Sequence, residues 1–136
     1  MYHQIGYMVI TEELKREVWN KAQKIGGYDP NMYRKDACGA WIIWNKYGIK
    51  DNLYGWEIDH IYPQIRLKEK GFSDEEIWDI RNLRPLQHDN NRNKGDDYPA
   101  YTAAVTSEGN TNIYIEKGLV VNLAVRERIE KLYHLQ

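Results

Sequence analysis

Cysteine is nearly absent, because Cys38 is the only one in the 136 residues. A single thiol excludes an internal disulfide and any zinc site built on paired Cys-x-x-Cys ligands. No apolar run approaches the about 18 residues needed to cross a bilayer, and residues 1–10 lack the basic start and cleavage site of a signal peptide. These absences predict a cytoplasmic protein with a non-covalently packed core and no membrane partner.

The sequence also lacks an excess of charge of either sign. It has 19 Lys and Arg residues against 20 Asp and Glu residues, for a net charge of −1. Nucleic-acid-binding proteins are often strongly basic, so the total charge argues weakly against that class. Phenylalanine is scarce as well, with one Phe against eleven Tyr and five Trp. Rings with a hydrogen-bonding tip suit a half-wet core or a binding surface, and both interpretations stay open.

The length and composition are those of one globular domain. The chain is 42% apolar and 29% charged, which excludes disorder or a coiled coil as an account of the whole chain. We find no internal repeat or linker. The sequence therefore predicts a single domain that spans residues 1–136.

The first half of the chain predicts one helix and two strands. Thr11 is expected to cap a helix with apolar residues at positions 14, 18, 22 and 25, which Gly26 and Gly27 would end. Residues 37–44 are compact and apolar, which indicates a buried strand, although a short helix fits nearly as well. Residues 55–61 alternate apolar and polar side chains, which predicts a strand with one polar face.

The second half adds further elements of both types. Ser73 and Glu76 form a capping-box pattern at the start of a short helix. Residues 82–88 are expected to be an edge or bent strand, because their proline removes a backbone donor. Asp89 is expected to cap one or two helical turns that end at Gly95.

The last third predicts short strands followed by a helix. Residues 101–121 contain β-like runs that are expected to break at 108–110 and at 116–118. A final helix is expected to begin near Asn122. Mixed elements in this order favour an α+β fold with short strands and flanking helices.

The residues most suggestive of chemistry lie near the ends of two predicted strands. Asp59 and His60 come near the end of one strand, and the polar run 88–94 follows the next. An aspartate carboxylate and an asparagine amide oxygen are hard ligands that suit Mg²⁺, and Asp59 and Asn91 supply that pair. His60 can share the site only where its strand ends or bulges, because neighbouring strand residues face opposite sides.

Three segments resemble the HNH endonucleases, whose active site is a ββα-metal unit of the His-Me finger type. The matching residues are 57–63 (EIDHIYP), 82–86 (NLRPL) and 90–96 (NNRNKGD). The segment is most similar to the H-N-N variant, which includes the HNH domain of RNA-guided CRISPR proteins. The resemblance implies an α+β fold with a central ββα-metal unit, whose motif core spans about residues 55–96.

The resemblance also implies a role for individual residues. Asp59 would bind the metal, His60 would be the general base, Asn82 would brace the loop that carries it, and Asn91 would be the second metal ligand. Many members carry paired cysteines around the last motif, where this chain has Gln87 and Asn90. Structural zinc is therefore not expected.

Basic residues gather around the motif despite the neutral total. Residues 81–95 contain four Lys or Arg residues against one acidic residue. Because phosphate contacts need positive charge only where the backbone lies, we predict that Arg84, Arg92 and Lys94 bind nucleic acid. His88 could orient the site, contact phosphate or merely cap its strand.

Together these features predict a divalent-metal-dependent endonuclease that hydrolyses phosphodiester bonds in DNA, with Mg²⁺ or Mn²⁺ as cofactor. The resemblance implies 5′-phosphate and 3′-hydroxyl products and one strand cut per site, so duplex cleavage would require two visits, a homodimer or another partner. An ordinary histidine pKa near ~6.5 would place a rise in activity between about pH 5.5 and 7.5. The alternative is a non-catalytic nucleic-acid-binding module with a degenerate HNH fold.

Overall fold

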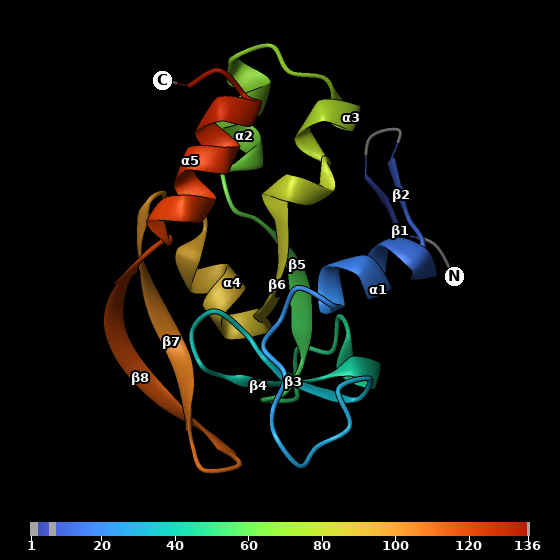
Figure 1. The fold of residues 1–136 in the computed structure, drawn as a ribbon, viewed down its shortest axis with the longest axis vertical. Helices are drawn as coiled ribbons and strands as arrows, with labels where there is room; N and C mark the ends of the chain where they lie inside the picture. The colour runs from blue at the N-terminus through green and yellow to red at the C-terminus, as the bar shows by residue number, and fades with distance from the viewer. Residues whose placement is uncertain (1–2, 6–7, 136) are drawn as a thin grey trace.

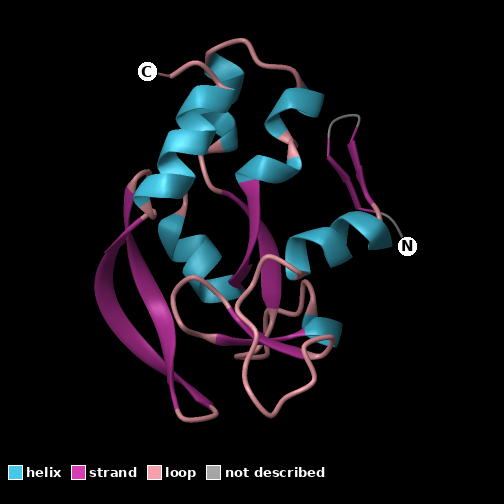
Figure 2. Cartoon of the chain, viewed as in Figure 1, coloured by secondary structure: helices cyan, strands magenta, loops and turns pink. Residues whose placement is uncertain are grey.

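The computed structural model describes residues 3–5 and 8–135, in which helices accompany four two-stranded antiparallel sheets (Figures 1 and 2). This confirms the mixed α+β class. The strands are β1 (His3–Ile5), β2 (Met8–Ile10), β3 (Tyr33–Lys35), β4 (Trp41–Ile43), β5 (Trp56–His60), β6 (Leu83–Gln87), β7 (Ala100–Glu108) and β8 (Thr111–Val120). The helices are α1 (Glu12–Trp19), α2 (Gln64–Glu69), α3 (Asp74–Ile77), α4 (His88–Lys94) and α5 (Leu123–Leu132), with short 3-10 turns at Trp44–Lys46 and Ile80–Asn82. None of the described helices combines the length and apolarity that crossing a membrane requires.

Helix α1 begins as predicted but ends early. The Thr11 side chain accepts a hydrogen bond from the Leu14 amide, which confirms the N-cap. The expectation that the helix continues to position 25 is wrong, because it ends at Trp19. The Arg34 guanidinium donates to the carbonyls of Asn20 and Ala22, at 3.0 and 3.1 Å. Arg34 thus satisfies these two carbonyls, and the helix ends before Gly26 and Gly27.

The strand predicted over residues 37–44 is confirmed only in the second half of that range. Strand β4 spans Trp41–Ile43, residues 37–40 form a turn, and Trp44 begins a 3-10 turn. The buried Asp36 carboxylate holds the turn, because its Oδ1 accepts from the amides of Cys38 and Ala40 at 2.9 Å each. Local hydrogen bonding therefore replaces the strand pairing that the apolar composition suggested.

Strands β5 and β6 lie side by side at the centre of the molecule, and α4 follows β6 directly (Figure 1). The pairing is antiparallel and places Asp59 opposite Arg84. Strand β5 ends at His60, one residue before the end of the strand predicted over residues 55–61. Strand β6 pairs only with β5 in the described sheets, as its proline predicted. A β-β-α arrangement thus forms from the segment that carries the candidate residues.

Helix α4 is anchored by the side-chain amides of two buried residues, Gln87 and Asn90. These are the two positions near which many HNH endonucleases carry paired cysteines. Asp89 was expected to cap this helix, which is wrong: Gln87 is the cap, and its Oε1 accepts from the amides of Asp89 and Asn90 at 2.8 and 3.0 Å. The Asn90 Nδ2 donates to Asp36 and to the Val105 carbonyl. The amides therefore fasten α4 to the β3–β4 turn and to β7. Gly95 ends the helix with φ of 51°, as predicted.

The C-terminal third forms one long hairpin and a helix. The turn at residues 108–110 is confirmed, but the break expected at 116–118 is wrong because β8 continues to Val120, with Gly118 paired to Thr102. Helix α5 begins after Asn122, whose side chain accepts from the Ala124 amide. The Ser73 capping box before α3 is also present.

Three tryptophan rings support one end of β5. Trp19, Trp44 and Trp56 pack with ring centroids 5.3–5.8 Å apart, and Trp56 is fully buried. Burial of such a side chain contributes on the order of 2–3 kcal/mol. The rings fix the start of β5, and Asp59 and His60 lie at its other end.

Candidate active site

Asp59 and His60 are neighbours on β5 and face opposite sides of the strand. The Asp59 carboxylate is 3% exposed and lies beside Arg84 of β6 and Lys94 of α4. The His60 imidazole packs edge-on against Trp78, with ring centroids 4.4 Å apart. Because β5 ends at His60 and α2 starts after Pro63, both side chains still reach the same region.

The Asp59 carboxylate is compensated by two cations. Its Oδ2 accepts a hydrogen bond from Arg84 Nε at 2.9 Å, and its Oδ1 lies 3.3 Å from Lys94 Nζ. Lys94 is 1% exposed and also donates to the His60 carbonyl at 3.1 Å. A buried carboxylate needs such partners. Burial lowers the pKa of Lys94, and the charge of Asp59 opposes that shift.

The His60 imidazole is held in its neutral form. Burial lowers its pKa to about 4, with the negative charge of Asp59 opposing the shift and the positive charge of Lys94 adding to it. Its Nε2 is buried and has no hydrogen-bond partner among the described residues. A neutral imidazole with a free nitrogen can accept a proton. The pKa of His60 is thus lower than the ordinary histidine value that was assumed from the sequence.

Asn82 fixes the backbone that follows His60. Its side chain is fully buried, with Oδ1 accepting from the Tyr62 amide at 2.8 Å and Nδ2 donating to the Tyr62 carbonyl at 3.0 Å. The Asn82 carbonyl accepts from the Ile61 amide at 2.8 Å. Three hydrogen bonds therefore tie residues 61–62 to the turn before β6.

Asp59, His60 and Asn91 line one cavity of about 230 Å³, which we call the Asp59 cavity. Asn91 reaches it from α4, and its Nδ2 donates to Glu57 Oε1 at 3.1 Å. A second cavity of about 380 Å³, the Trp78 cavity, shares four lining residues with the first: Ile58, His60, Gln64 and Asn91. A strand end and a helix thus bring together residues that lie about thirty positions apart in the chain.

Gln64 and Glu57 belong to this region and did not emerge from the sequence. Gln64 opens α2 and lines both cavities, and its Oε1 is buried with no partner in the described part of the chain. Glu57 lines the Trp78 cavity. A usable signal existed for each, because Glu57 lies on the same strand face as Asp59 and Gln64 directly follows the matched run 57–63.

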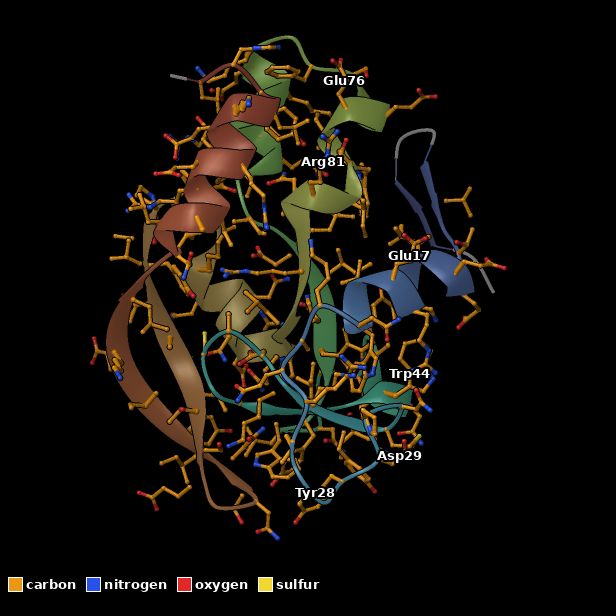
Figure 3. All side chains as sticks on the ribbon, viewed as in Figure 1. Glu17, Tyr28, Asp29, Trp44, Glu76 and Arg81 are labelled. Atoms are coloured by element: carbon orange, nitrogen blue, oxygen red, sulfur yellow. The ribbon has the colours of Figure 1, made fainter. Side chains whose placement is uncertain are left out.

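The structure separates the three residues that were predicted to contact nucleic acid. Arg92 is exposed on α4, whereas Arg84 and Lys94 are turned inward onto Asp59. Contact between Lys94 and a bound strand would require breaking its bond to Asp59. Arg81, labelled in Figure 3, pairs with Asp79 at 2.7 Å. His88 is buried beside Asp89 and lines neither cavity of the site.

The oxygen donors fit a hard cation that retains most of its waters. Asp59 and Asn91 offer two such donors at one cavity, and Mg²⁺ commonly takes one or two ligands from protein and others from substrate phosphate. Within residues 3–5 and 8–135, no group of three or more His, Cys, Asp or Glu side chains is arranged to hold a metal ion. A site with two protein ligands, Asp59 and Asn91, has fewer than the three side chains of such a group. Lys94 would compete with a cation for Asp59 Oδ1.

Comparison of the chain with protein-family models, with curated proteins and with solved structures gives no match. Its function must therefore be argued from the geometry of the site.

Proposed function

We propose that the chain is a divalent-metal-dependent endonuclease of the HNH type that hydrolyses phosphodiester bonds in DNA. One observation carries the proposal: Asp59 and His60 from the end of β5 and Asn91 from α4 line the same cavity. Asn82 supports it, because its bonds to Tyr62 hold the chain immediately after His60. Asp, His and Asn residues each have common structural roles when they occur singly, but their presence at one cavity favours a catalytic role.

His60 would act as the general base. Its ring is fixed against Trp78, and its buried Nε2 has no competing donor among the described residues. With its pKa lowered to about 4, the imidazole is neutral throughout the physiological range. A low pKa also makes it a weaker base, so its contribution depends on position as well as on proton affinity.

Asp59 and Asn91 would hold the metal. When bound, a divalent cation would offset the negative charge that develops on the phosphate and the leaving oxygen. Arg84 and Lys94 already compensate Asp59, so the cation gains less from this carboxylate than from a free one. We therefore expect weak metal binding by the protein alone and tighter binding with a nucleic-acid phosphate present.

The compensation of Asp59 also favours a second candidate, a nucleic-acid-binding module without turnover. A carboxylate with both oxygens engaged by cations is stable without metal. Calorimetric titration with Mn²⁺ distinguishes the candidates. The nuclease requires Mn²⁺ binding that Asp59→Asn weakens, and the module predicts no binding that depends on Asp59.

The test of the nuclease is incubation of supercoiled plasmid with the protein in Mg²⁺, Mn²⁺ or EDTA. We expect nicking that requires a divalent ion and falls by about 10²–10⁴-fold in His60→Asn, as for loss of a general base. His134→Asn is the matched control, because His134 is exposed and has φ of 54°, which asparagine also adopts readily. Equal nicking by His60→Asn and His134→Asn would refute the assignment of His60.

A further inference from the structure

A larger hollow lies where the end of α1, the β3–β4 turn, β6 and the β7–β8 hairpin meet, and its wall residue Arg84 also binds Asp59 of the candidate active site. Its main cavity has a volume of about 600 Å³, and an adjoining cavity of about 320 Å³ shares Lys21, Ala37 and Arg84 with it. We call the two cavities together the Lys21 hollow. Neither cavity shares a lining residue with the Asp59 or Trp78 cavities.

Positive charge is concentrated at the Lys21 hollow. Its lining contains one carboxylate, Asp36, and five cationic side chains: Lys21, Lys35, Arg84, Lys117 and Arg128. The whole chain has a net charge of −1, so this concentration departs from the average surface. Among the described residues, Arg84 is the only one of the five that forms an ion pair. The other four form no ion pair with any acidic group in the described part of the chain.

The single carboxylate does not neutralise the hollow. Asp36 Oδ1 accepts from the Cys38 and Ala40 amides, and Oδ2 accepts from the Gln87 amide and Asn90 Nδ2, at 2.9–3.0 Å. Four donors occupy its oxygens, and burial raises its pKa. Asp36 is thus bound into the wall and does not extend toward a ligand.

Two cations at the shared wall have unused capacity for a ligand. Arg84 Nη2 is buried and has no partner in the described part of the chain. Lys21 Nζ donates to the carbonyls of Ile80 and Leu83, which holds the ammonium at the wall. Partial burial and repulsion from Arg128 and Arg84 lower the pKa of Lys21 to about 8. A bound anion would relieve that repulsion.

The walls of the hollow are fastened to one another. Thr106 and Ser107 of β7 donate through their hydroxyls to the carbonyls of Cys38 and Gly39 in the β3–β4 turn, at 2.9 and 2.6 Å. A preformed site of this volume accommodates a phosphate with its attached sugar and base.

We propose that the Lys21 hollow binds a phosphate group, delivered either by the backbone of a nucleic-acid strand or by a free nucleotide. The strand as source rests on the proposed nuclease function, which supplies a nucleic-acid substrate. The hollow offers several cationic donors around one space, as phosphate recognition requires.

Binding measured in EDTA tests the site without cleavage. Fluorescence anisotropy would follow a labelled single-stranded oligonucleotide, and calorimetry would follow AMP. The test variant is Lys35→Gln with Lys117→Gln, because neither side chain donates a hydrogen bond to another described residue. Lys68→Gln with Lys131→Gln is the matched control, because both lysines are exposed and removing them lowers the charge equally. Circular dichroism would verify the fold of each variant.

The test variant should bind the oligonucleotide about tenfold more weakly than the control, with a salt dependence lower by about two counterions. Saturable AMP binding that is lost in the test variant would support the site with a free nucleotide as the source. Test and control variants that bind both ligands like the wild type would overturn the inference. Plasmid nicking in Mg²⁺ separates the two proposals. If the wild type nicks the plasmid and the test variant binds both ligands unchanged, only the phosphate site at the Lys21 hollow is refuted. If the wild type binds the ligands but does not nick the plasmid, only the nuclease function is refuted.

Discussion

Lowering the pH should destabilise the metal-free protein through His60 in particular. Burial lowers the pKa of His60 to about 4, against an ordinary value of about 6.5 in the unfolded chain. Between these values the unfolded chain binds the proton and the folded chain does not, so acid favours unfolding. The stabilising effect of neutral His60 is thus fully present above about pH 6.5 and is lost as the pH falls toward 4.

The size of the effect follows from the two pKa values. Between pH 7 and pH 4.5, preferential protonation of the unfolded chain at this one residue removes about 2 kcal/mol of unfolding free energy. Other groups with shifted pKa values also contribute to the pH dependence, including Asp36, whose pKa burial raises. Their contributions cancel when the wild type is compared with His60→Asn, which has no imidazole at this position.

Urea unfolding in EDTA at several pH values between 7 and 4.5 measures this difference. We expect the wild type to lose about 2 kcal/mol more than His60→Asn over the range, and His134→Asn to follow the wild type. Parallel profiles for the wild type and His60→Asn would show that the imidazole is not buried in its neutral form. The reasoning for a neutral base would then fail.

Two further predictions concern buried groups. Asn82→Ala should lower the free energy of unfolding, measured in urea, by about 2–4 kcal/mol, because it leaves the Tyr62 amide and carbonyl unpaired. An effect no larger than that of Asn93→Ala, at an exposed position, would contradict the bracing role of Asn82. Cys38 should react with a thiol reagent far more slowly in the native protein than in urea, because burial raises its pKa to about 12, and equal rates would show that the β3–β4 turn is open.

Local signals in the sequence predicted the fold best. The Thr11 and Ser73 caps and the Gly95 stop depend on residues within a few positions, and all three are present. The early end of α1 depends on Arg34, which lies fourteen residues from the Asn20 carbonyl that it binds. No periodicity within the helix could indicate that contact.

Three residues of the candidate site were predictable from the sequence, but Glu57, Gln64 and the electrostatics of the site were not. The spacing of Asp59, His60 and Asn91 indicated a shared site, and the structure places all three at one cavity. The sequence suggested that Lys94 is a surface cation, because it follows Arg92 and Asn93 in a polar run. Its burial on Asp59 arises from the packing of α4 against β5, which a charge count cannot reveal.

The central claim is tested most directly by the products of cleavage. A labelled DNA duplex would be incubated with excess protein in Mg²⁺, in Mn²⁺ and in EDTA, and the ends of any fragments would be identified. We predict 5′-phosphate and 3′-hydroxyl ends, formed only with a divalent ion and lost in His60→Asn but retained in His134→Asn. An intact duplex in both metals, or cleavage that persists in EDTA or in His60→Asn, would contradict a nuclease at the Asp59 cavity.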